Sequence, residues 1–153
     1  MGKKIRNQAN NLGLTKLRKT SLYARAKNIR MMAFSNAPDT ADAIKDYLKP
    51  LDPSFVNDKS GGGRNATYYY LAPQLELYVE VISKVSGFSP HNPANHAIQI
   101  NIFCEKDEYI RAIANLINQI WEDGILPHIN WEKIKKKYKV NKQDAIATWN
   151  EFL

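Results

Sequence analysis

The middle of the chain alternates hydrophobic and polar residues in two stretches. Residues 75–82 place aliphatic side chains at every second position, and residues 98–103 repeat the pattern with three isoleucines. A period of two sends alternate side chains to opposite faces of a strand. Two further strands, Ser54–Asp58 and Asn65–Leu71, flank a loop with three consecutive glycines, which is typical of a hairpin. The pattern therefore predicts about four strands.

Other segments have hydrophobic residues three or four positions apart, which indicates helices. Leu14–Phe34 contains no proline or glycine and has apolar residues at 22, 26, 29 and 33. A short helix ends before Pro50, and a longer one begins with Asp107 as its cap and ends before Gly124. Two short helices, separated near Asn141, complete the C-terminal end.

Consecutive strands followed by a helix favour antiparallel pairing, because parallel strands need crossover connections. We expect an α+β fold: a mostly antiparallel sheet of about four strands with helices packed on one face, a basic N-terminal helix and a helical C-terminal tail. The 153 residues suit one domain. Within it we distinguish a basic N-terminal helical segment (1–36), an α+β body (37–127) and a C-terminal helical tail (128–153).

Charge is distributed unevenly along the chain, whose formal net charge is +7. Residues 1–36 hold nine cations and no acid, residues 37–132 hold seven cations and thirteen acids, and residues 133–153 hold six lysines and two acids. Basic ends on a mildly acidic body point to a polyanionic partner. Fifteen Asn, fifteen Ile and sixteen Lys against six Arg are typical of AT-rich genomes and their mobile elements.

Four of the N-terminal cations form a stripe if the segment is helical. At about 100° per residue, these four side chains fall within an arc of roughly 80° that also holds a tyrosine and Phe34. Such a stripe neutralises phosphates and offers a ring on which bases stack. An ordinary solvated helix face is the alternative. The stripe consists of Lys16, Lys19, Tyr23, Lys27 and Arg30.

Two further groups of cations are candidate contacts for nucleic acid. Arg64 follows the glycines of the predicted hairpin, and Lys135, Lys136 and Lys137 lie between two apolar groups of the C-terminal tail. The glycine loop lacks the Gly-Lys-Ser/Thr ending of a phosphate-binding loop, so a hairpin turn is its simpler interpretation.

A carboxylate pair raises an enzymatic alternative. Glu76, Glu80 and Lys84 are separated by even numbers of residues, so a strand would project them from one face. Clustered carboxylates and a lysine are what a Mg²⁺-dependent nuclease uses. The spacing is unsuitable for the common Glu-x-Lys arrangement and no third carboxylate is evident, so we expect a solvated strand face.

The remaining reactive residues point to no catalytic centre. His91, His96 and His128 lack the pattern of a hydrolase, and no nucleophile motif is present. Cys104 ends an apolar strand and is expected to be a small buried hydrophobe. The sequence predicts no metal site and no cofactor. Tyr68, Tyr69 and Tyr70 are consecutive, so a strand divides them between its faces.

Three functions therefore stand as hypotheses. The first is a non-enzymatic protein that binds a polyanion, most simply nucleic acid. The second is a small Mg²⁺-dependent nuclease. The third is an adaptor or inhibitor, from a mobile element, that binds a protein partner or sequesters an anionic nucleotide. Because no apolar run reaches the roughly 18 residues of a membrane span and no secretory signal is evident, we expect a cytoplasmic protein without a membrane partner.

Overall fold

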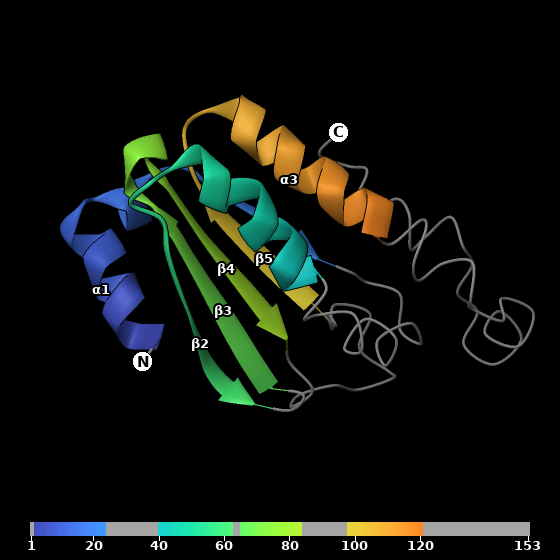
Figure 1. The fold of residues 1–153 in the computed structure, drawn as a ribbon, viewed down its shortest axis with the longest axis horizontal. Helices are drawn as coiled ribbons and strands as arrows, with labels where there is room; N and C mark the ends of the chain where they lie inside the picture. Colours follow the sequence, from blue (N-terminus) through green and yellow to red (C-terminus); the bar gives the residue numbers. More distant parts are fainter. Residues whose placement is uncertain (1, 24–39, 63–64, 84–97, 121–153) are drawn as a thin grey trace, which may run out of the picture.

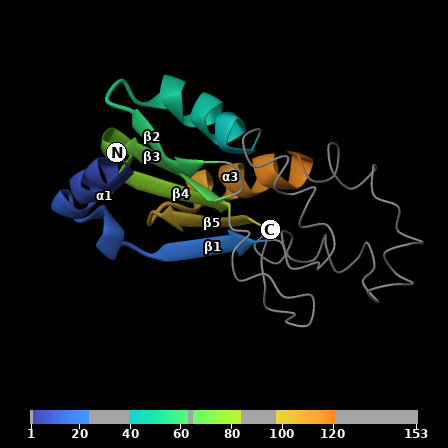
Figure 2. The same ribbon diagram turned by 90° about the horizontal axis from the view of Figure 1, so that it is seen from below.

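Five antiparallel strands form one sheet in the order β1-β5-β4-β3-β2. The computed structural model describes residues 2–23, 40–62, 65–83 and 98–120. Figure 1 shows the fold, and Figure 2 shows the strands following one another from β2 to β1. The strands are β1 Lys19–Tyr23, β2 Val56–Gly62, β3 Asn65–Ala72, β4 Leu77–Ser83 and β5 Ile98–Phe103.

Two helices cover one face of this sheet, which we call the helix-covered face. They are a helix over residues 40–48 and α3 Asp107–Gln119, which both run roughly along the strand direction in Figure 1. Their apolar stripes include Ile44, Leu48 and Ile113, which are fully buried together with Val79 and Ile100 of the sheet. This is the larger of the two cores.

The opposite face carries α1 Gly2–Asn11 and the 3-10 helix η1 Leu14–Lys16, and we call it the α1 face. Ile5 and Ala9 lie one helical turn apart and pack with Leu71, Tyr78 and Phe103 of the sheet. Full burial of a side chain the size of Ile5 contributes about 1.5–3 kcal/mol to the stability of the fold. Because the described part of α1 buries Ile5 and Ala9, few apolar side chains attach this helix to the sheet.

A left-handed glycine separates α1 from the next element. Gly13 has φ 74° and ψ 8°, a conformation that costs other residues about 1–2 kcal/mol. Its amide donates to the carbonyl of Asn10 at 3.0 Å, as in common helix C-terminal caps. The chain then turns through η1 into β1.

The helix expected over Leu14–Phe34 is wrong for residues 14–23. Residues 14–16 form η1, and Lys19–Tyr23 is the edge strand β1, paired antiparallel with β5. Leu22 packs in the larger core from this strand. A single buried leucine is compatible with a strand as well as with a helix. Residues 19–23 form a strand because they pair with β5, some 80 residues away in the sequence. Residues 24–34 lie outside the described residues.

The α+β class and the antiparallel sheet are confirmed, with five strands where about four were expected. The helices were expected on one face, whereas α1 lies on the other because Ile5 and Ala9 give it an apolar stripe of its own. Helix α3 begins at Asp107, and the N-cap of this helix is Lys106 and not Asp107 as expected. The predicted C-terminal tail lies outside the described residues.

Among the described helices, none is long and apolar enough to cross a bilayer.

Candidate nucleic-acid interface

The side chains of the α1 face form three rows that run across the strands. The first row is apolar and contains Leu71, Tyr78 and Phe103, beneath α1. The strand register then defines a second row, and beyond it a third. The second row is Ser21, Asn101, Glu80, Tyr69 and Asp58, and the third is Gln99, Ile82, Thr67 and Ser60, with Tyr23 of β1 as the register partner of Gln99.

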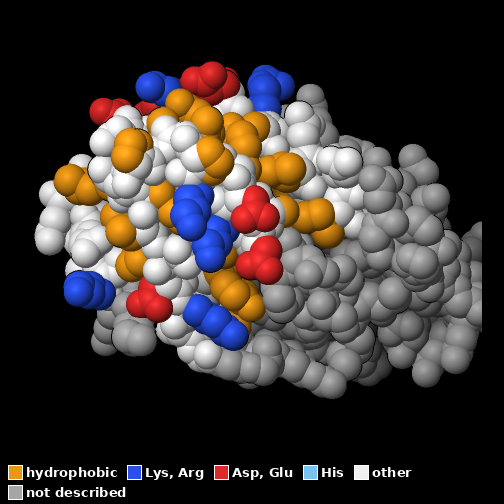
Figure 3. Space-filling view, viewed as in Figure 1, with side chains coloured by type: hydrophobic (Ala, Val, Ile, Leu, Met, Phe, Trp, Pro, Cys, Tyr) orange, Lys and Arg blue, Asp and Glu red, His pale blue; other side chains and the backbone are white. Residues whose placement is uncertain are grey.

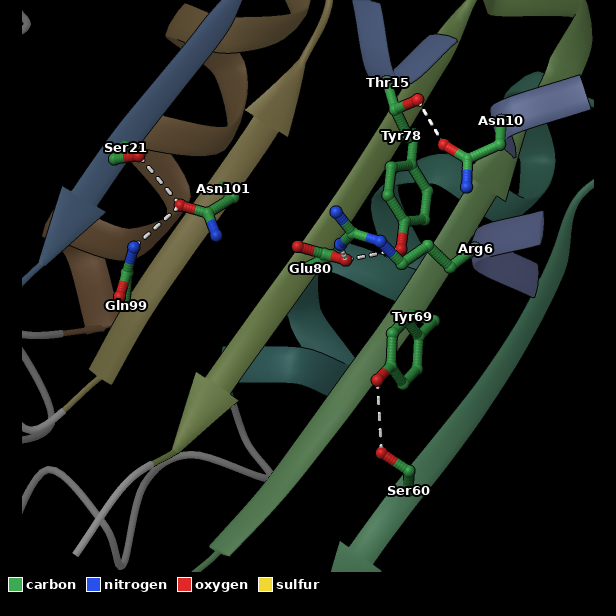
Figure 4. A network of polar contacts seen from close by, with 10 residues as sticks. All are labelled: Arg6, Asn10, Thr15, Ser21, Ser60, Tyr69, Tyr78, Glu80, Gln99 and Asn101. Atoms are coloured by element: carbon green, nitrogen blue, oxygen red, sulfur yellow. Dashed lines mark hydrogen bonds and ion pairs between the residues drawn. The ribbon is translucent and has the colours of Figure 1, made fainter. Parts of the chain in front are cut away.

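Asn101 organises the part of these rows nearest β1. Its side-chain oxygen accepts hydrogen bonds from Ser21 Oγ at 2.8 Å and from Gln99 Nε2 at 3.0 Å (Figure 4). Asn101 is 4% exposed, whereas Ser21 and Gln99 are half-buried. A buried amide that accepts two bonds thus holds two partly exposed polar side chains in fixed positions.

Glu80 occupies the centre of the second row and is the buried charge of this face. Its Oε2 accepts a hydrogen bond from Tyr78 Oη at 2.7 Å and forms an ion pair with Arg6 of α1. The Glu80 side chain is 5% exposed and that of Arg6 is 46% exposed. Burying a carboxylate is costly unless it is paired and hydrogen-bonded, so this triad fixes α1 over the sheet.

The same contacts shift the pKa values of the partners. The hydrogen bond to Glu80 raises the pKa of Arg6, so the guanidinium stays charged. Burial, followed by the hydrogen bond to Glu80, raises the pKa of Tyr78 far above its ordinary value. At pH values near neutrality the triad therefore contains a neutral Tyr78 phenol and a charged Arg6 guanidinium.

Tyr69 is the half-buried aromatic residue of the second row. Its hydroxyl lies 3.2 Å from Ser60 Oγ on β2, and the ring packs against the smaller core around α1. Tyr68 and Tyr70 point to the helix-covered face, where Tyr70 stacks with Phe55 at 6.0 Å. The three consecutive tyrosines are thus divided as the strand pattern predicts.

The N-terminal elements of the α1 face carry cations and no acid. Residues 2–23 contain six lysines and arginines and no acid, and they form α1, η1 and β1. Lys4, Lys16 and Lys19 are exposed, and Lys19 is the β1 neighbour of Phe103 in the first row. Arg18 instead bonds to Glu105 and Asp107 at the start of α3.

Charge on the other side of the molecule is mixed. The helix over residues 40–48 and the turn after it present Asp42, Lys45, Asp46 and Lys49. Figure 3 shows acidic and basic side chains interspersed among hydrophobic ones on this side. The elements α1, η1 and β1 therefore differ from this side in carrying no acid, although β4 and β2 place Glu80 and Asp58 in the second row of the α1 face.

The structure describes only part of the predicted contact set. Lys16, Lys19 and Tyr23 belong to η1 and β1 of one acid-free stretch, although they do not lie on a helix as expected. Lys19 and Tyr23 are the β1 register partners of Phe103 and Gln99 on β5. The other members lie outside the described residues: Lys27, Arg30, Arg64, Lys135, Lys136 and Lys137.

The expected solvated carboxylate face is also wrong. Glu80 is buried against α1, and Glu76 precedes β4 as the exposed residue that ends the 3-10 helix Pro73–Leu75 with φ 52°. Lys84 lies outside the described residues. Among the residues that the structure places, no group of three His, Cys, Asp or Glu side chains is arranged to hold a metal ion.

Cys104 matches its expected role as a small buried hydrophobe. It is fully buried in the larger core, and burial raises the pKa of its thiol. Arg6, Ser21, Gln99 and Asn101 were not predicted from the sequence as members of a common surface. The signal for two of them was present, since Gln99 and Asn101 alternate with the buried isoleucines of β5.

Comparison with known proteins yields no relative. No family model matches the sequence, and no curated protein or solved structure shows significant similarity to it. A function for this protein therefore has to be inferred from its own residues.

Proposed function

We propose that this protein is a non-enzymatic binding protein for a polyanionic partner, and that the partner is nucleic acid. The observation that carries the proposal is the acid-free N-terminal stretch, residues 2–23, which forms α1, η1 and β1 around one face of the sheet. Exposed helices and strands ordinarily mix charges of both signs, because neighbouring like charges oppose one another.

The positions of the cations support a phosphate-binding role. Lys4, Lys16 and Lys19 are exposed, and among the described residues no acid forms a salt bridge with any of them. An exposed lysine that pairs with a phosphate releases a condensed counterion, which drives polyelectrolyte binding. Arg6 is already paired with Glu80, so we assign it to holding α1.

The test is a titration of labelled DNA and RNA with the full-length protein at two salt concentrations. Affinity should fall steeply between about 50 and 200 mM salt, because phosphate contacts release counterions. Addition of Mg²⁺ should leave the nucleic acid intact. Absence of binding at the lower salt concentration would refute the proposal, and metal-dependent cleavage would favour an enzyme in its place.

A further inference from the structure

The polar part of the α1 face consists of hydrogen-bonding side chains on both sides of the central strand β4. Ser21, Ser60, Thr67, Tyr69 and Gln99 are all half-buried, and we call them the polar surface. Ser21 and Gln99 come from β1 and β5, the other three come from β2 and β3, and Glu80 and Ile82 of β4 lie between the two groups. Within the described residues, α1 packs on the first row, its Arg6 pairs with Glu80 of the second row, and Tyr69 packs against the smaller core.

This surface has the wrong shape for a DNA groove but suits unpaired bases. An α-helix or a two-stranded ribbon enters the major groove, whereas the polar surface spans several strands of one sheet. Sheet faces that bind single strands combine partly exposed aromatic rings with nearby hydrogen-bonding groups and cations at the margin. Here Tyr69 supplies a ring, and Lys16 and Lys19 stand beside the first row.

The hydrogen bonds of Asn101 determine what the polar surface offers to a base. Gln99 uses its Nε2 to donate to Asn101, and Ser21 donates its hydroxyl to the same oxygen. Figure 4 shows the side-chain oxygen of Gln99 on the side away from Asn101. The oxygens of Gln99 and Ser21 are therefore left as hydrogen-bond acceptors.

We infer that the polar surface binds the bases of single-stranded nucleic acid and prefers bases that carry an amino group. Acceptor oxygens pair with the exocyclic amino groups of cytosine, adenine and guanine, whereas thymine and uracil present carbonyl oxygens at the corresponding positions. Asn101 is a positioning residue in this scheme, because it acts through Gln99 and Ser21. The inference rests on the proposed nucleic-acid binding and specifies its substrate.

The first experiment compares three ligands of equal length and charge: oligo(dC), oligo(dT) and an abasic strand. The protein should bind oligo(dC) roughly 3- to 10-fold more tightly than oligo(dT), the factor for one net hydrogen bond. It should bind the abasic strand more weakly than either. Equal affinity for all three would overturn the inference and leave the proposed function standing, whereas loss of all binding at low salt would remove the proposed function itself.

Substitutions then locate the preference. Gln99→Ala should abolish the preference for oligo(dC) over oligo(dT). Gln74→Ala is the matched control, because Gln74 also donates one side-chain hydrogen bond, to Ser54 Oγ at 3.0 Å, but on the 3-10 helix Pro73–Leu75. An undiminished preference in Gln99→Ala, or an equal loss in both variants, would contradict the assignment.

The aromatic ring provides a second readout. Tyr69→Ala should weaken binding of oligo(dC) about 5- to 100-fold through lost stacking, with no change for the abasic strand. Tyr69→Phe retains the ring and should retain the affinity, which controls for the lost hydrogen bond to Ser60. Equal weakening on oligo(dC) and the abasic strand would show that the substitution disturbs the fold and not base stacking, and would overturn the role given to Tyr69.

Discussion

Arg6 in the first helix and Glu80 in the central strand β4 form an ion pair across 74 residues of sequence. The pair is asymmetric, because Glu80 is almost fully buried while Arg6 is half-exposed. The guanidinium can be rehydrated when its partner is removed, and the carboxylate cannot. This asymmetry governs how the two residues respond to substitution.

Arg6→Gln should destabilise the protein more than Glu80→Gln does. The first change leaves a buried carboxylate without its cation, at a cost of roughly 2–3 kcal/mol after allowance for the exposure of Arg6. The second removes the buried charge and keeps an acceptor for Tyr78, so we expect about 1 kcal/mol or less. The double variant should recover much of the stability lost in Arg6→Gln. Urea unfolding measures all three, and a larger loss in Glu80→Gln would contradict this account.

Alkaline pH should destabilise the fold through Tyr70 and Tyr78. Burial raises the pKa of both phenols above the ordinary value of 10.0. Their stabilising effect is thus complete below about pH 10 and is lost as the pH rises from there toward the folded pKa, because the unfolded phenols release protons first. Unfolding free energies measured across this range should fall, and the fall should be smaller in Tyr70→Phe. If the free energy of unfolding fell as steeply with pH in Tyr70→Phe as in the parent protein, Tyr70 would not be a cause of the alkaline destabilisation.

Cys104 should serve as a reporter of folding. Its thiol is fully buried, its pKa is raised by burial, and thiolates rather than thiols react with alkylating reagents. Alkylation of the native protein should be much slower than that of the urea-unfolded chain. Equal rates would mean that this part of the core opens readily.

Much of the fold could be predicted because its signals are local. The hairpin of β2 and β3, the alternation in β4 and β5, and the isoleucine stripe of α3 are each contained in a short stretch. The edge strand β1 could not be predicted in this way, because Leu22 is the one residue that it contributes to the larger core among its described side chains, and its partner β5 is distant in sequence. The same limit applied to α1, whose described side chains give a stripe of only Ile5 and Ala9.

The sequence predicted some of the residues of the candidate site, but it did not predict how they are arranged in space. The absence of acids near the N-terminus identified Lys16 and Lys19, although the assumed helix arranged them incorrectly. Glu80 was expected on a solvated face because its partner Arg6 belongs to another segment. Asn101 gained its role only when the register of β1 and β5 placed Ser21 opposite it. Pairings of this kind arise from tertiary structure, which local periodicity does not encode.

The C-terminal lysines test whether the contact surface extends beyond the described residues. Replacing Lys135, Lys136 and Lys137 together by alanine should weaken binding of nucleic acid and reduce its salt dependence, if this cluster contacts phosphates. Thermal stability should change little, because surface substitutions are usually within about 0.5 kcal/mol. Normal affinity in the triple variant would confine the surface to the N-terminal elements.

The most direct measurement compares the salt dependence of two double variants with that of the parent protein. Lys16→Gln/Lys19→Gln alters the α1 face, and Lys45→Gln/Lys49→Gln removes the same charge from the other side of the sheet. For single-stranded ligands each phosphate contact contributes about 0.7 to the slope of log affinity against log salt. The first variant should therefore lower the slope by up to about 1.4, while the second leaves it unchanged. Equal slopes in all three proteins, or a loss confined to the second variant, would contradict nucleic-acid binding by the α1 face.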